Sequence, residues 1–316
     1  MEDKIICFYA ISAPPDRVYG FGQHGWNIES PIGIFKLYNC NVYSICNSDN
    51  CYLVKDKYIK ISKSEILNLK PDYFIARAYC DFGEFTKVFN NSKYSIYLYA
   101  ALTPKNKDLN KFDKIIREEQ FFKPLPDLNI FSKNDSYIKK YITCCGSFLP
   151  RKNQLKIIEE IDRNIIKNYT LVLCGVIKDE IYFNKVIDTL KRRKISFIIP
   201  ISNDNKIRKF YGNGYLKHDE LASLYKQSIC FILMSSCDGN PKSLLEAILT
   251  GVPFIISDEV KINNDYQKFG IQTNINNLNS SLNKILKKEV KFPKITEDFR
   301  SKHTMKYFAE NVLCLK

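Results

Sequence analysis

Strands and helices alternate along the second half of the chain, and this alternation restricts the possible folds more than any other feature. Short apolar runs at 141–146, 169–175, 195–200 and 229–235 have the length and β-branched content of buried strands. Segments with helical periodicity at 153–168, 179–193 and 218–227 separate most of them. This order predicts a parallel, doubly wound α/β sheet with helices on both faces.

The segment 229–257 shows this alternation of strand and helix in most detail. An apolar strand at 229–235 is followed by Asn240, a good N-cap, and by Pro241, which suits a first helical position. Gly251 and Pro253 are stop signals, so a helix is predicted over 241–250, and a second strand follows at 253–257. The segment is therefore a βαβ unit.

Two acids lie in this unit, Asp238 before the helix and Glu246 within it. The end of a parallel strand and the start of the next helix form the usual ligand site of such units, where free amides favour an anion. The alternative is that Asp238 caps the loop while Glu246, on the helix side opposite the apolar stripe, pairs with Lys242 on a solvated surface. The segment alone leaves both interpretations open.

The composition of the chain indicates its kind of partner and its cellular compartment. The net charge of +14 suggests an anionic partner, although a lysine-rich composition alone explains it equally well. The 11 cysteines lack zinc-ligand spacing, and several lie in apolar runs, which indicates buried thiols in a reducing compartment. No secretory signal is recognisable at the start and no apolar run reaches 18 residues, so we expect a cytoplasmic protein.

The length of 316 residues suits two domains. The first half also has an α/β pattern, though a less regular one, and turn-forming residues at 120–136 mark a linker. We predict one domain at 1–130 and a second at 131–297. The helical segment 298–316 is predicted to return to the first domain.

Four segments in the same order resemble the family 4 retaining glycosyltransferases of the GT-B fold, which have two Rossmann-like domains facing each other across a cleft. Asp238 and Glu246 match the family's acid-x7-acid motif, with Asp in place of the usual first Glu. The other three segments are "CGSFLPRKNQ" at 145–154, "LVLCG" at 171–175 and "GYLKHDELASLYKQSICFILMSS" at 214–236.

The resemblance implies a donor site for a UDP- or GDP-sugar in the second domain. Arg151 and Lys152 would bind the diphosphate, Glu246 the ribose hydroxyls and Asp238 the donor sugar, while Tyr215 and Leu216 would flank the base. Ordinary core packing is an equal alternative for the last two. The donor contacts implied are Gly146, Arg151, Lys152, Tyr215, Leu216, Asp238, Gly239, Asn240, Ser243, Leu244 and Glu246, with Lys152, Asp238 and His24 as the catalytic candidates.

In the first domain a glycine-rich loop, with Gly20, Gly22 and Gly25, follows the first predicted strand and contains His24. The resemblance places such a loop near donor phosphate or acceptor, and glycines let backbone approach a ligand closely. A flexible loop with an incidental histidine is the alternative. Arg77 and Asp81, near the end of a later strand, are weaker candidates.

The expected activity is transfer of a sugar to a hydroxyl acceptor on a glycan, a lipid-linked molecule or a protein, with retention of anomeric configuration. The chain contains no Asp-x-Asp pair, so we expect neither a metal nor another cofactor. Two alternatives remain: a glucosyltransferase acting on nucleic acid, which the charge favours, and an inactive sugar-nucleotide-binding module. Peripheral contact with an anionic membrane is a further expectation, whereas nucleic acid is the less favoured partner.

Overall fold

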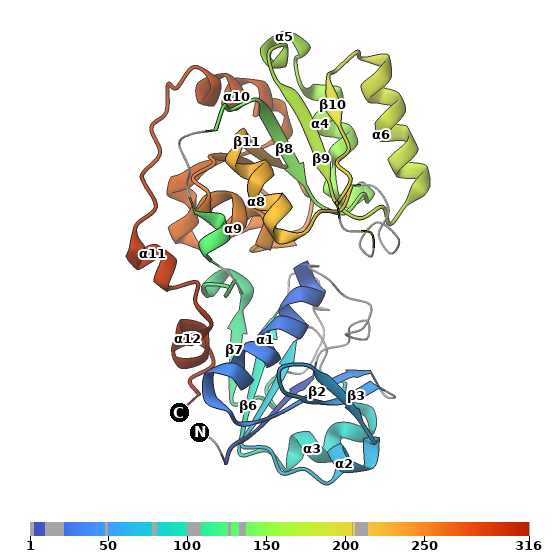
Figure 1. The fold of residues 1–316 in the computed structure, drawn as a ribbon, viewed down its shortest axis with the longest axis vertical. Coiled ribbons are helices and arrows are strands. Elements are labelled where there is room, and N and C mark those ends of the chain that lie inside the picture. Colours follow the sequence, from blue (N-terminus) through green and yellow to red (C-terminus); the bar gives the residue numbers. More distant parts are fainter. Residues whose placement is uncertain are drawn as a thin grey trace. The chain divides into compact units, whose positions relative to one another are not determined.

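The computed structural model describes residues 3–9, 22–47, 50–77, 81–99, 109–125, 128–132, 137–203, 205 and 214–315, with the backbone alone for 22–28 and 47. The chain divides into two compact units (Figure 1). Unit 1 comprises Met1–Pro126 and Ser301–Lys316, and unit 2 comprises Asp127–Arg300. The end of the chain therefore returns to the first unit.

Unit 1 contains a seven-stranded sheet in the order β4-β3-β2-β1-β5-β6-β7. Five strands are parallel, and β3 and β4 form an antiparallel extension beside β2 that the sequence analysis did not predict. The strands are β1 (Ile5–Tyr9), β2 (Asn41–Asn47), β3 (Asn50–Val54), β4 (Tyr58–Ile61), β5 (Tyr73–Arg77), β6 (Tyr94–Tyr99) and β7 (Lys114–Arg117).

Both faces of this sheet are covered. One core joins Ile6 and Ile96 of the sheet to Ile34 of α1 (Gly22–Tyr38) and Phe308 of the C-terminal segment. That segment contains α12 (Met305–Tyr307) and a π-helical turn at Phe308–Val312. The second core is aromatic and lies beside α2 (Lys63–Leu67) and α3 (Thr86–Asn90). The C-terminal segment thus supplies part of the hydrophobic core of unit 1.

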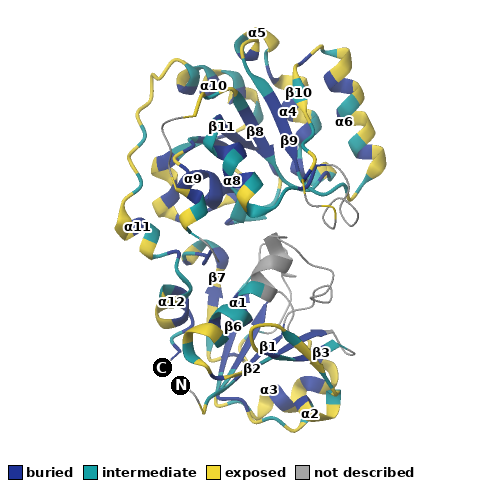
Figure 2. Ribbon diagram, viewed as in Figure 1, coloured by how far each residue is buried: buried dark blue, intermediate teal, exposed yellow. Residues whose placement is uncertain are grey.

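Unit 2 contains a six-stranded, fully parallel sheet in the order β10-β9-β8-β11-β13-β15. Its four central strands are mostly buried, whereas most of the helices expose one side (Figure 2). The strands are β8 (Tyr141–Cys145), β9 (Thr170–Cys174), β10 (Phe197–Ile198), β11 (Ser228–Leu233), β13 (Phe254–Ser257) and β15 (Gly270–Thr273). The helices are α4 (Gln154–Glu160), α5 (Arg163–Ile166), α6 (Glu180–Arg192), α8 (His218–Lys226), α9 (Lys242–Leu249), α10 (Leu278–Leu286) and α11 (Glu297–Ser301).

Two doubly wound α/β units confirm the predicted fold class. The sequence signal was strong in unit 2 because its strands are buried on both faces and read as continuous apolar runs. No helix in the described part of the chain has both the length and the apolar character needed to cross a membrane.

Candidate functional site

The candidate site of unit 2 lies where the strand order of its sheet reverses. β8 and β11 are neighbours, but the chain continues from β8 to β9 on one side and from β11 to β13 on the other. In doubly wound sheets ligands bind beyond the carboxyl ends of the two strands at such a switch point. The loops that follow β8 and β11 carry most of the residues predicted for the donor site.

The loop after β8 is held firmly in place. The amide of Gly146 donates to Cys174 O at 2.8 Å and that of Phe148 to Val176 O at 2.8 Å, which continues the pairing with the β9 side past the strand end. The buried Gln154 donates its Nε2 to Gly146 O at 3.2 Å and to Ser147 O at 3.0 Å. The loop ends in a 3-10 turn, Pro150–Lys152, directly before α4.

Three glycines allow the loops after neighbouring strands to pack backbone against backbone. The amide of Gly175, after β9, donates to Gly214 O at 2.6 Å, and the amide of Gly214 donates to Pro200 O at 2.7 Å. Gly175 has a φ of +151°, and a Cβ there would lie 2.0 Å from Gly146 O. At Gly146 itself a Cβ would make only ordinary contacts, at 3.6 Å from Lys152 Cδ and 3.9 Å from Leu233 Cδ1.

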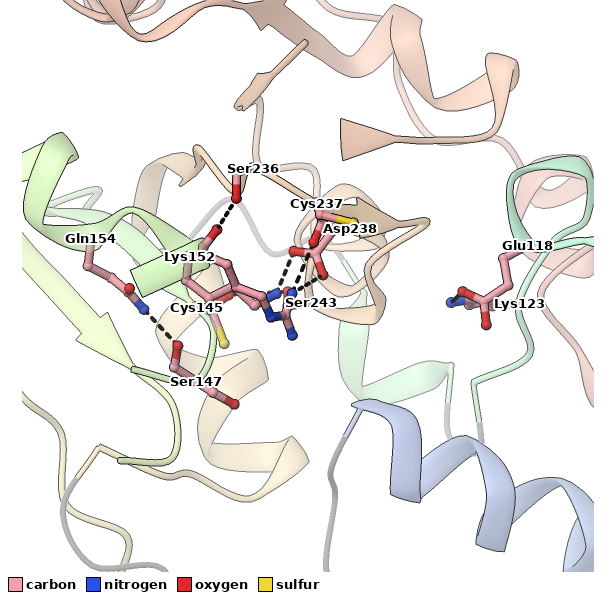
Figure 3. A network of polar contacts seen from close by, with 11 residues as sticks. Glu118, Lys123, Cys145, Ser147, Lys152, Gln154, Ser236, Cys237, Asp238 and Ser243 are labelled. Atoms are coloured by element: carbon pink, nitrogen blue, oxygen red, sulfur yellow. Dashed lines mark hydrogen bonds and ion pairs between the residues drawn. The ribbon is translucent and has the colours of Figure 1, made fainter. Parts of the chain in front are cut away.

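Hydrogen bonds tie the loop after β8 to the loop after β11. Ser236 N donates to Arg151 O at 2.9 Å, and Asn153 Nδ2 donates to Met234 O at 2.7 Å. The Arg151 guanidinium also donates from Nη1 to Cys237 O at 2.9 Å. The two loops therefore form one polar network (Figure 3).

A cluster of opposite charges lies at the centre of this network. Arg151 Nη1 is 3.3 Å from Asp238 Oδ1, and Lys152 Nζ contacts Asp238 Oδ2, so both carboxylate oxygens face a cation. Lys152 is only 9% exposed, whereas Arg151 reaches solvent. The sequence analysis placed all three residues in the donor site, and the structure brings them together. Figure 3 shows Lys152 directed toward Asp238.

The start of α9 differs slightly from the prediction. The helix begins at Lys242 and its N-cap is Pro241, one residue later than predicted, because Asn240 has a left-handed backbone with φ of 45°. Asp238 and Gly239 form the short strand β12 with β14 (Val260–Lys261). This turn brings Asp238 back toward the loop after β8.

Glu246 is not on a solvated surface. It is 3% exposed, in a helix whose residues 244–249 are all buried, so the alternative that placed it on a solvated surface is wrong. The helical wheel failed because α8 and the ends of the strands cover that side of α9: Tyr225 of α8 donates its hydroxyl to Ser243 O at 3.2 Å. Burial, together with charges that include Glu246, raises the pKa of Tyr225 well above its usual value.

The remaining predicted donor contacts lie around these loops. Ser243, in the first turn of α9, donates its hydroxyl to Cys145 O at 3.4 Å. Leu244 is a core residue whose amide donates to Pro241 O at 3.2 Å, which leaves this amide less available to a ligand. Tyr215 is buried and Leu216 partly buried in the segment between Gly214 and α8.

The sequence analysis missed Lys178, which lies in the loop between β9 and α6. Partial desolvation lowers its pKa, and the positive charges of Arg151 and Lys152 lower it further. A bridge between Phe148 and Ile177 holds its loop beside the loop after β8. A basic residue shortly after the Gly that ends a parallel strand was the available signal. It was weak because lysines occur throughout this chain.

The candidates in unit 1 fare differently. Gly20 lies outside the described residues, as does the side chain of His24. The prediction of a glycine-rich loop is wrong from Gly22 onward, because Gly22 and Gly25 belong to helix α1.

Arg77, at the end of β5, is buried and binds Glu118, which also receives Lys123 Nζ at 3.1 Å. Asp81 accepts from Gly83 N at 3.2 Å in a local turn. Both residues thus have structural partners. Among the described residues of either unit, no group of three or more His, Cys, Asp or Glu side chains could hold a metal ion.

Several solved structures share the fold of this chain over nearly its whole length. A glycosyltransferase from Rickettsia africae matches at 11% identity and a TM-score of 0.60, over 99% of this chain and 94% of that one. Sucrose-phosphate synthase from Thermosynechococcus elongatus matches at 10% identity and a TM-score of 0.61, over 99% of this chain and 98% of that one. The Anabaena protein HepE, in complex with UDP, matches at 11% identity and a TM-score of 0.60, over 99% of this chain and 100% of that one.

These likenesses show the fold, and they place the chain among the GT-B proteins with two Rossmann-like domains. The profile of the family described as glycosyl transferases group 1 matches residues 128–303, more than half of the chain. The chain therefore belongs to the group 1 glycosyl transferases. No curated protein matches its sequence.

Proposed function

We propose that this chain transfers a sugar from a nucleoside-diphosphate sugar to a hydroxyl acceptor, with retention of anomeric configuration and without a metal ion. The observation that carries the proposal is the cluster of Arg151, Lys152 and Asp238 at the switch point of the unit 2 sheet, beside the start of α9. The family match to this unit supports the reaction class, and the UDP complex of HepE supports the class of donor.

The chemistry of transfer needs positive charge at this place. When the bond between the anomeric carbon and the phosphate oxygen breaks, negative charge develops on the leaving diphosphate. A cation already positioned there, together with the amides at the start of α9, stabilises that charge without reorganisation. Lys152, largely desolvated and held beside Gly146, is the best placed cation for this role.

The two acids have different parts in this proposal. Asp238 binds hydroxyls of the donor sugar and Glu246 binds those of the ribose, as in the family motif. A carboxylate suits both tasks because its two oxygens accept hydrogen bonds from neighbouring hydroxyls. The burial of Glu246 speaks against the alternative in which it is a solvated surface acid.

Retention follows from attack on the face from which the phosphate leaves. The acceptor oxygen forms the new bond to the anomeric carbon as the phosphate bond breaks, and the acceptor proton passes to the departing phosphate oxygen. Atoms and charge balance without an enzymatic nucleophile. The acceptor and a cytoplasmic or membrane-peripheral location stay predictions.

Thermal stabilisation tests the donor site directly. Wild type, Lys152→Ala and a control, Lys156→Ala, are melted with UDP, GDP, ADP and CMP, alone and as sugar conjugates, in EDTA. Lys156 is exposed on α4 and lies outside the charge cluster. We expect one base to stabilise wild type and the control, and the stabilisation to disappear in Lys152→Ala.

Transfer with the selected donor, followed by NMR of the product anomer, tests the reaction itself. Loss of the Lys152 charge should lower the rate by about 100-fold or more, as removal of one preorganised electrostatic group does elsewhere. Stabilisation of Lys152→Ala equal to that of wild type would remove the site assignment. An inverted product would remove the proposed stereochemistry, and activity that EDTA abolishes would remove metal independence.

A further inference from the structure

We propose that Lys178 is a third cation of the donor site and binds the diphosphate directly, whereas Arg151 mainly holds the loop that carries Asp238. This inference rests on the proposed function and adds to it a residue outside the motifs of the sequence analysis. It assigns different tasks to the three neighbouring cations.

The fold brings Lys178 to the loop that carries the other two cations. Cys145 and Cys174 are paired at the ends of β8 and β9, and the pairing continues through a bridge between Phe148 and Ile177. Lys178 directly follows Ile177, which forms one half of that bridge. Arg151 lies shortly after Phe148, which forms the other half. The two loops therefore advance together past the sheet edge.

Arg151 already has protein partners. Its Nη1 donates to Cys237 O at 2.9 Å and lies 3.3 Å from Asp238 Oδ1, and its own carbonyl accepts from Ser236 N at 2.9 Å. All of these contacts go to the loop after β11. A guanidinium held in this way orders a loop, and part of its charge is already matched by Asp238.

Lys178 differs from both neighbours. Among the described residues it has no hydrogen bond or ion pair, while Lys152 contacts Asp238 Oδ2. The next residue, Asp179, uses its carboxylate to cap α6 through Tyr182 N at 2.9 Å. Lys178 is an exposed side chain, and its ammonium thus has no anionic partner in this part of the structure.

Electrostatics shows why this arrangement suits an anion. Partial desolvation lowers the pKa of Lys178, and the charges of Arg151 and Lys152 lower it further. The charged ammonium of Lys178 is therefore destabilised when no anion is bound. Residues perturbed in this way are concentrated at functional sites. Three cations and one carboxylate leave two positive charges, which matches a diphosphate with about one negative charge on each phosphate.

The test compares wild type, Lys178→Ala and Lys178→Arg with a control, Lys185→Ala, an exposed lysine of α6. UDP, GDP, ADP and CDP are first screened with wild type. Isothermal titration then measures the selected nucleoside diphosphate and the corresponding monophosphate and nucleoside. Thermal midpoints are recorded without ligand.

We expect Lys178→Ala to bind the diphosphate about 10-fold more weakly, or about 1.4 kcal/mol. Nucleoside affinity should stay unchanged, and Lys178→Arg and the control should remain within about threefold of wild type. The midpoint without ligand should not fall, because the substitution removes repulsion and no protein contact.

Unchanged diphosphate affinity in Lys178→Ala would overturn the inference and leave the proposed donor site intact. Equal loss of diphosphate and nucleoside affinity, or a lower midpoint without ligand, would also overturn it, because either result indicates a structural role. Failure of wild type to bind any of the four diphosphates would instead refute the proposed function, and the inference with it.

Discussion

Replacement of Gly175 by alanine tests whether backbone packing at the sheet edge positions the donor site. Gly175 has a φ of +151°, which L-residues rarely adopt, and its Cβ would lie 2.0 Å from Gly146 O and 2.4 Å from Gly146 C. Both contacts are with backbone, so no side-chain rotation can relieve them. The loop after β8 would have to move.

The cost has two parts. Backbone strain at such a φ contributes about 1–3 kcal/mol, and displacement of a packed neighbour contributes a further 1–3 kcal/mol or so. We therefore expect Gly175→Ala to lower the free energy of unfolding of unit 2 by about 2–6 kcal/mol. For a domain of this size the thermal midpoint should fall by roughly 4–24 °C.

Gly83→Ala is the matched control. Gly83 also has a positive φ, +49°, but a Cβ there would meet nothing within 4 Å. Only the backbone strain remains, at about 1–2 kcal/mol. Calorimetry of each variant measures the loss, and hydrogen exchange of the β8 and β9 amides shows whether it lies in unit 2.

Gly175→Ala should also weaken nucleotide binding, because the displaced segment includes Gly146 and lies beside Lys152. A loss of stability no greater than that of Gly83→Ala would refute the steric argument. Normal nucleotide affinity in a destabilised Gly175→Ala protein would show that the packing supports the fold without positioning the site.

Two further predictions concern unit 1. Glu118→Gln should lower the free energy of unfolding by about 3–5 kcal/mol in thermal or denaturant unfolding, because it leaves the buried cations Arg77 and Lys123 without their carboxylate. Burial raises the pKa of Glu118, but these two cations hold it below its usual value overall. A loss as small as that of the exposed Glu65→Gln would contradict this. Asp72 accepts from Ile5 N at 2.9 Å and binds Lys93 Nζ at 2.9 Å, and although burial raises its pKa, these contacts and Lys4 lower it overall. Since its folded-state pKa is depressed, its stabilising contribution is complete above its unfolded pKa, near pH 4, and is lost as pH falls through the folded value. Asp72→Asn should therefore be less stable than wild type at pH 7 and lose less stability on acidification; parallel pH profiles of the two proteins would refute the assignment.

Sequence reasoning succeeded where a local pattern carries the information. The buried parallel strands of unit 2 are continuous apolar runs, and the helices between them have a clear period, so the doubly wound fold could be predicted from residues 141–257. The family resemblance placed Lys152 and Asp238 in one donor site, and the structure brings these two side chains into contact.

Sequence reasoning failed where a distant segment changes the local outcome. The glycines at the start of α1 predicted a loop, yet α1 is anchored by the buried Ile34 against the sheet, and tertiary packing outweighs the cost of glycine in a helix. The antiparallel pair of β3 and β4 depends on contact with β2, which no single segment specifies.

The sequence by itself determined the alternation of elements, the residue types after each strand and the spacing of Asp238 and Glu246. Only the tertiary structure decided that Glu246 is buried, that Arg151 binds the Cys237 carbonyl and that the loop with Lys178 runs beside the loop after β8. The physical reason is that a helical wheel or a strand end gives the direction of a side chain along its own element. What covers that side chain depends on which strands become neighbours, and the pairing of β8 with β9 and β11 joins segments far apart in the chain.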